Sequence, residues 1–135
     1  MRLKRKLTIV AASVTLCLGY TLTVHADDDK VSPVFAGKLP NLPGQTLTVL
    51  RVDYPPGGKS GKHHHAGSVL AYVLSGTIRS ENSATGPSKT YKAGETFFEP
   101  AGSEHLVSEN ASSTESASLI AIFVAGDGAI LKTSD

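Results

Sequence analysis

The sequence predicts a single all-β domain, either a sandwich or a small barrel. From residue 45 onward, short runs rich in β-branched and aromatic residues alternate with segments that hold glycine, proline and asparagine. No segment keeps a helical spacing of apolar residues for as many as three turns, and the chain has no internal repeat. Many short strands at this spacing are typical of two packed sheets or a closed barrel.

Each expected strand ends where turn residues begin. The first run, QTLTVLRVDY, stops at PPGGKSG, and the next two, SVLAYVL and GTIRSEN, meet at a glycine. The later runs are KTYKAG, ETFFEP and HLVSEN, and the apolar run ASLIAIFVAG comes last. The expected strands are residues 45–54, 68–74, 76–82, 89–94, 95–100, 105–110 and 117–126.

The ends of the chain differ in composition from this central part. Residues 1–26 begin with the basic segment MRLKRK, continue through an apolar run and end with a small residue before Asp27. This order is typical of a secretory signal peptide, with cleavage expected after Ala26; an uncleaved anchor is the alternative. Residues 27–44, rich in proline, aspartate and lysine, are expected to form an N-terminal arm. The barrel should then cover 45–126 and a C-terminal tail 127–135.

Removal of the leader changes which functions are open to the domain. The only cysteine, Cys17, lies in the leader, so the mature chain would have neither a disulfide nor thiolate chemistry. The leader also holds four of the 13 basic residues and none of the 12 acids, which leaves a mildly acidic domain. A nucleic-acid partner is therefore not expected. We expect a periplasmic or secreted protein with no membrane attachment after cleavage.

Four histidines of the expected mature chain fall in two short segments. His63, His64 and His65 are consecutive, and His105 follows 40 residues later, after the turn PAGSE. Side chains alternate along a strand, so His63 and His65 share a face and His64 is expected to act as a spacer between them. His105 could supply a third ligand from a neighbouring strand.

Two motifs around these histidines resemble those of the cupins, which are small double-stranded β-helices, also called jelly-roll barrels. Gly57, His63, His65 and Gly76 match the first cupin motif, and YVLSG at 72–76 is close to the residues that cupins usually have at the end of this motif. In the second motif, Gly94, Pro100, Gly102 and His105 match in order and spacing, whereas Asn110 falls one residue late. The resemblance implies a metal site formed by His63, His65 and His105.

The sequence departs from the cupin pattern at the fourth ligand. The first motif places a glutamate at position 69, where this chain has Val69. Three neutral imidazoles would leave a divalent ion its full charge, and they favour iron, zinc or nickel over manganese. Ala71 and Val73 should face inward with Val69 and give the barrel an apolar interior.

Glu99 is the acid that could take part in the site, and it is the candidate catalytic residue. It alternates with Phe97 at the end of an expected strand, beside the turn that leads to His105. One interpretation makes it a rim residue at the strand end. If its face is the barrel interior, it could instead be a general base, a partner of a ligand or a distant ligand.

Two functions remain open at this stage. The first is a metal-dependent enzyme that acts on a small molecule by oxygenase, lyase or isomerase chemistry, because the resemblance fixes the fold and not the reaction. The second is a non-catalytic module that binds a metal or small ligand, or that acts as a sensor. The resemblance also implies a homodimer. The five aromatic residues of the expected strands should pack in the core or in that dimer: Tyr54, Tyr72, Tyr91, Phe97 and Phe98.

Overall fold

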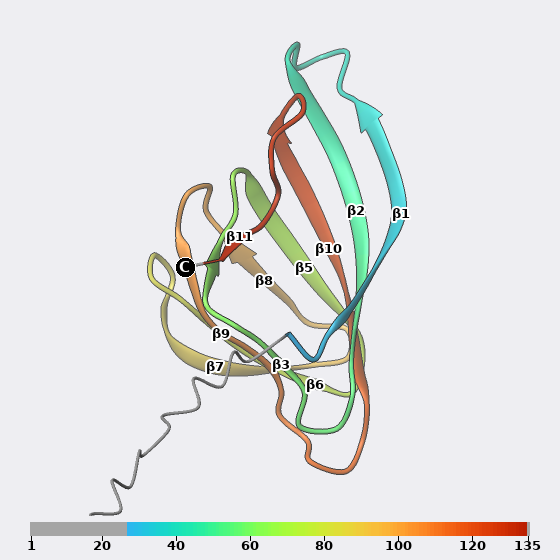
Figure 1. Cartoon of the computed structure of the whole chain (residues 1–135), viewed down its shortest axis with the longest axis vertical. Helices are drawn as coiled ribbons and strands as arrows, with labels where there is room; N and C mark the ends of the chain where they lie inside the picture. Colours follow the sequence, from blue (N-terminus) through green and yellow to red (C-terminus); the bar gives the residue numbers. More distant parts are fainter. Residues whose placement is uncertain (1–26, 135) are drawn as a thin grey trace, which may run out of the picture.

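The described part of the chain is built from two antiparallel β-sheets. The computed structural model describes residues 27–134, so the signal peptide expected over residues 1–26 lies outside the described residues. Within 27–134 the chain forms strands and turns and no helix, and hence no helix long and apolar enough to cross a membrane. The two sheets face each other across the interior (Figure 1), which confirms the double-stranded β-helix predicted from the sequence.

Each sheet places strands that are far apart in the sequence next to one another. The order in the five-stranded sheet is β1 (Lys30–Lys38), β2 (Gln45–Tyr54), β10 (Ala117–Gly126), β5 (Ser68–Ser75) and β8 (Thr96–Glu99). The order in the other sheet is β11 (Thr133–Ser134), β4 (His63–His64), β9 (Glu104–Asn110), β6 (Thr77–Asn82) and β7 (Gly86–Lys92), with the short β3 (Lys59–Ser60) paired to β9. All seven expected strands are present, and the largest change in their bounds is the earlier start of β7.

The expected N-terminal arm contains a long strand that the sequence did not indicate. β1 pairs with β2 along its whole length and forms one edge of the five-stranded sheet. Its register shifts between Pro33 and Phe35. Proline cannot donate a backbone hydrogen bond to a neighbouring strand and is confined to edges and bulges. Pro33 therefore favours irregular chain when the sequence is considered alone. The expected tail, residues 127–135, likewise contains β11, which pairs with β4.

Alternation along the strands builds the core between the sheets. On β5, Val69, Ala71 and Val73 are at most 1% exposed, as predicted, whereas Leu70 and Tyr72 point outward and are both 42% exposed. Burial of such apolar side chains is the main favourable term in folding. The buried apolar cluster consists of Val52, Tyr54, Val69, Ala71, Val73, Ile78, Phe97, Ala117, Leu119, Ala121 and Phe123.

Gly76 carries the chain from β5 in one sheet to β6 in the other. Its φ of 69° lies in the left-handed region that side chains with a Cβ rarely adopt. A Cβ there would also lie 2.6 Å from the carbonyl oxygen of Ser116. The crossing between sheets therefore requires glycine at this position.

We expect Gly76→Ala to lower the free energy of unfolding by about 2–4 kcal/mol, because backbone strain and overpacking add at this position. Gly126→Ala is the matched control, since no atom lies within 4 Å of a Cβ at Gly126. It should change stability by less than about 0.5 kcal/mol. Urea denaturation of both variants measures the difference, and equal losses would contradict the assigned role of Gly76.

Candidate metal centre

Strand pairing brings the three predicted histidines together. In the β4–β9 ladder His63 lies directly opposite His105, so both side chains project from the same face into the interior. His65 follows two residues after His63, and its carbonyl accepts a hydrogen bond from Gly102 N in the turn before β9. The ring centroid of His63 lies 4.7 Å from that of His65 and 5.0 Å from that of His105. All three side chains are buried.

Backbone carbonyls fix the tautomers of His63 and His65. His63 Nδ1 lies 2.6 Å from Gly61 O, and His65 Nδ1 lies 2.8 Å from Leu131 O. A carbonyl oxygen can only accept, so both Nδ1 atoms carry the proton and both Nε2 atoms present a lone pair. These two Nε2 atoms are 3.2 Å apart. Neither can donate to the other, so a buried pair of acceptors faces the same point.

His105 contributes a third acceptor. Its Nε2 lies 2.9 Å from Ser80 Oγ, whereas its buried Nδ1 has no hydrogen-bond partner. When Nε2–H donates to Ser80, the free lone pair is on Nδ1. One nitrogen from each of the three histidines lies within 4.8 Å of the others. Metal–nitrogen bonds of about 2.0–2.1 Å in a tetrahedral site place ligand atoms about 3.3 Å apart. The donor set and the unpartnered Nδ1 therefore fit a divalent transition metal.

Glu99 faces this cluster. Its side chain is 3% exposed, and Oε2 lies 3.1 Å from His105 Nδ1 and 3.8 Å from His65 Nε2. Asn82 Nδ2 donates to the same oxygen at 3.4 Å. The interpretation of Glu99 as a rim residue is therefore wrong, because β8 continues its inward alternation from Phe97 to its last residue.

Burial sets the charge state of the cluster. It lowers the pKa of His65 to about 4 and that of His105 to about 3, and it lowers the pKa of His63 as well. Burial raises the pKa of Glu99 to about 7, which the hydrogen bond from Asn82 partly opposes. At neutral pH the three imidazoles are uncharged, which is the state in which histidine binds a metal.

His64 has the spacer position predicted for it. It lies opposite Glu104 in the β4–β9 ladder, and alternation turns it away from the side on which His63 and His105 meet. Its side chain is half-buried. Glu104 lies 2.8 Å from Lys62 in an ion pair, so it too is directed away from the histidine cluster.

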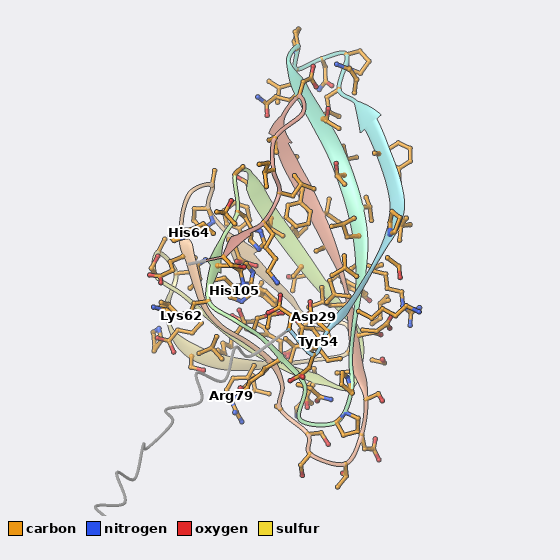
Figure 2. All side chains as sticks on the ribbon, in the orientation of Figure 1. Asp29, Tyr54, Lys62, His64, Arg79 and His105 are labelled. Carbon is orange, nitrogen blue, oxygen red and sulfur yellow. The ribbon has the colours of Figure 1, made fainter. Side chains whose placement is uncertain are left out.

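A cavity of about 110 Å³ adjoins the histidines. Asp29, Tyr54 and His105, which all line it, are labelled in Figure 2. Leu131 and Lys132 line it as well. Asp29 and Lys132 belong to the expected arm and tail, and no sequence pattern marks either one, because their approach to the site depends on how residues 27–29 and 131–134 pack.

The two ends of the described part of the chain, near residues 27 and 134, are tied down beside this cavity. Lys132 forms an ion pair with Asp27, and Asp27 Oδ1 accepts a hydrogen bond of 2.7 Å from Gly61 N. Gly61 O is the acceptor for His63, and Leu131 O is the acceptor for His65. The segments at 27–29 and 131–134 thus hold the histidine rings from the outside.

Comparison with known proteins identifies the architecture. The family model described as "Cupin domain" matches residues 50–123. Among curated proteins, none matches the sequence. Solved structures with a similar fold include the DMSP lyase DddQ from Ruegeria pomeroyi DSS-3, with 18% identity and a TM-score of 0.56 over 65% of this chain and 42% of that one.

Two further solved structures extend the comparison. An oxalate oxidase has 23% identity and a TM-score of 0.61, over 80% of this chain and 56% of that one. A cupin domain from Bordetella pertussis Tohama I has 19% identity and a TM-score of 0.56, over 74% of this chain and 96% of that one. Identities this low show a shared fold. The chain spans about half the length of the lyase and oxidase chains.

The buried histidines predict how the stability of the metal-free protein depends on pH. Unfolded histidine takes up a proton near pH 6.5, whereas His65 and His105 do so only near 4 and 3 when folded. Stability should therefore fall as the pH drops below about 6.5, by up to about 1.4 kcal/mol per pH unit for each histidine. Glu99 acts in the opposite direction between pH 4.5 and about pH 7, because it holds its proton more tightly in the folded protein than in the unfolded chain. Its contribution to stability rises as the pH falls through this range and cancels the contribution of one histidine.

Urea denaturation in the presence of a chelator, between about pH 7 and 5, measures this dependence. Stability that rises as the pH falls through this range would contradict the assigned neutral state of the histidines.

Proposed function

The chain belongs to the cupin family, and from this premise we propose that it binds a divalent transition metal through His63, His65 and His105 and acts on a small molecule beside it. The observation that carries this proposal is the cluster of three buried imidazoles: the Nε2 atoms of His63 and His65 carry no proton, and His105 Nδ1 has no hydrogen-bond partner. A cation among them would turn mutual repulsion into coordination. The bound metal would supply Lewis acidity and positions open to a substrate.

The dimensions of the cavity support a small substrate. Its volume of about 110 Å³ is below the roughly 150 Å³ of an engineered cavity that admits benzene, so it suits a molecule of only a few heavy atoms. Two of the matched structures are enzymes named for small molecules, an oxalate oxidase and a DMSP lyase. We infer that this chain acts on a molecule of comparable size.

The walls of the cavity indicate what such a molecule carries. Leu119 and Phe123 provide apolar contact, whereas Lys132 provides a cation at the edge of the site. Lys132 is already paired with Asp27, and Asp29 also lines the cavity, so the group that would attract a substrate carboxylate is the metal itself. The apolar walls exclude water around the rest of the molecule and strengthen these polar contacts.

A non-catalytic binding or sensor module is the second candidate. The contacts of residues 27–29 and 131–134 beside the site favour it, because the Asp27–Lys132 ion pair and the β11–β4 pairing fix one wall of the cavity. A binder benefits from a fixed wall, whereas an enzyme must release its product. Turnover assays on the metal-loaded protein separate the two candidates.

Elemental analysis of the protein purified from expressing cells tests the metal proposal. We expect about one equivalent of a divalent transition metal. His63→Ala and His105→Ala should each lose most of it, whereas His64→Ala, the matched control within the same histidine tract, should retain it. Unchanged metal content in both His63→Ala and His105→Ala would show that the ligand set is wrong.

The metal-loaded protein then decides between enzyme and binder. Oxygen uptake and product formation are measured with carboxylates, carbonyl compounds and thiols of only a few heavy atoms, with the His105→Ala variant as the inactive control. Turnover that disappears in this variant supports the enzyme. A bound metal without turnover of any of these compounds supports the binding module.

We further propose that the protein is exported, with cleavage after Ala26, and that it forms a homodimer. The leader composition supports export. The exposed apolar side chains of Leu70, Tyr72 and Phe98 on the outer face of β5 and β8 support self-association. Native mass spectrometry of the protein recovered from expressing cells tests both. A chain that begins at Met1 would contradict cleavage, and a monomer at micromolar concentration would contradict the dimer.

A further inference from the structure

We propose that Glu99 is the fourth protein ligand of the metal and takes the place of the carboxylate that the first cupin motif puts at position 69. The inference rests on the proposed metal function and adds a ligand at a position that neither cupin motif specifies. With Glu99 included, the metal would have one anionic ligand in addition to the three neutral histidines.

The register of the five-stranded sheet carries the first step. In the β5–β8 ladder Val69 lies directly opposite Glu99. Side chains at such paired positions share a face, with Cβ atoms about 4.5–5.5 Å apart. Both residues are buried and face the interior, Val69 at 1% exposure and Glu99 at 3%. A glutamate at position 99 can therefore reach the same region as a glutamate at position 69.

The distances within the cluster carry the second step. Glu99 Oε2 lies 3.1 Å from His105 Nδ1 and 3.8 Å from His65 Nε2, and the Nε2 atoms of His63 and His65 are 3.2 Å apart. Ligand atoms around one ion with bonds of about 2.0–2.1 Å are expected about 2.9 Å apart in octahedral and about 3.3 Å apart in tetrahedral geometry. The carboxylate oxygen and the ring nitrogens are thus spaced like ligands of one ion.

The hydrogen bonds of the rings separate a ligand from a supporting residue. A carboxylate that orients a metal-bound histidine accepts the N–H on the side of the ring away from the metal. Here those positions are already filled by Gly61 O for His63, by Leu131 O for His65 and by Ser80 Oγ for His105. Glu99 instead lies toward the unprotonated Nε2 of His65 and toward His105 Nδ1, with which it makes no hydrogen bond. This is the position of a ligand.

A carboxylate ligand alters which metals suit the site. It lowers the charge of a bound divalent ion and its first ligands from +2 to +1 and adds an oxygen donor. Oxygen ligands suit manganese, which three imidazoles alone disfavour. The preference for iron, zinc or nickel expected from the sequence therefore widens to include manganese.

Metal affinity in Glu99→Gln tests the inference without any activity assay. We expect the dissociation constant, measured by competition with a chromophoric chelator, to rise at least about tenfold. The visible spectrum of the cobalt-loaded protein should also change. Glu104→Gln is the matched control, because Glu104 is adjacent to His105 and faces Lys62 instead of the cluster. This control should bind like the wild type.

A double variant tests the equivalence of the two paired positions. Val69→Glu combined with Glu99→Val returns the carboxylate to the position of the cupin motif, and we expect it to recover most of the affinity that Glu99→Gln loses. Thermal unfolding of the metal-free variants checks that each one folds. Glu99→Gln that folds and binds metal as tightly as the wild type would overturn the inference.

The crystal structure of the metal-loaded wild type decides the question even if a variant fails to fold. We expect a Glu99 carboxylate oxygen about 2.0–2.2 Å from the ion. A carboxylate held away from an ion that the three histidines bind would overturn this inference and leave the proposed function intact. A wild-type protein that binds no metal would overturn the proposed function itself.

Discussion

The structure depends on three buried imidazoles that face one another, with unprotonated Nε2 atoms on His63 and His65 and an unpartnered Nδ1 on His105. Such an arrangement is unfavourable without a cation, since each lone pair is removed from water and given no donor. The chain nevertheless fixes it, because Gly61 O and Leu131 O hold the Nδ1 protons of His63 and His65 on the outer side. Local stability has thus been given up for a donor set, and residues 27 and 131–132 take part in holding these rings through Gly61, Leu131 and the Asp27–Lys132 ion pair.

Strand pairing positions the side chains of the cluster from both sheets. His63 and His105 project from β4 and β9 in one sheet, and Glu99 projects from β8 in the other. An ion shared by these residues would therefore link the two layers of the barrel. A ligand that binds only the folded state stabilises it in proportion to the logarithm of its concentration over its dissociation constant. Metal binding and the packing of the two sheets are consequently expected to be coupled.

The sequence predicted the parts of this molecule that depend on local pattern. Alternation and turn residues indicated all seven principal strands, and the spacing of His63, His65 and His105 indicated the cluster. The sequence could not reveal β1 or the approach of Lys132, because both depend on pairing between distant segments. The sequence leaves the interior position of Glu99 as one of two interpretations, since a strand end can turn outward or continue its alternation.

Position 69 shows the limit of a sequence motif. A motif specifies where a ligand lies along the chain, whereas metal binding requires only that the ligand atom lies close to the ion. In an antiparallel ladder two residues far apart in sequence, here Val69 and Glu99, occupy nearly the same place on one face. A carboxylate can move from one to the other while the rest of the site stays as it is. Both positions cannot easily hold an acid, because two carboxylates so close together would raise the pKa of one of them and keep it protonated. The valine at 69 is therefore the expected companion of a glutamate at 99, and its presence need not mean that the site has lost its anion.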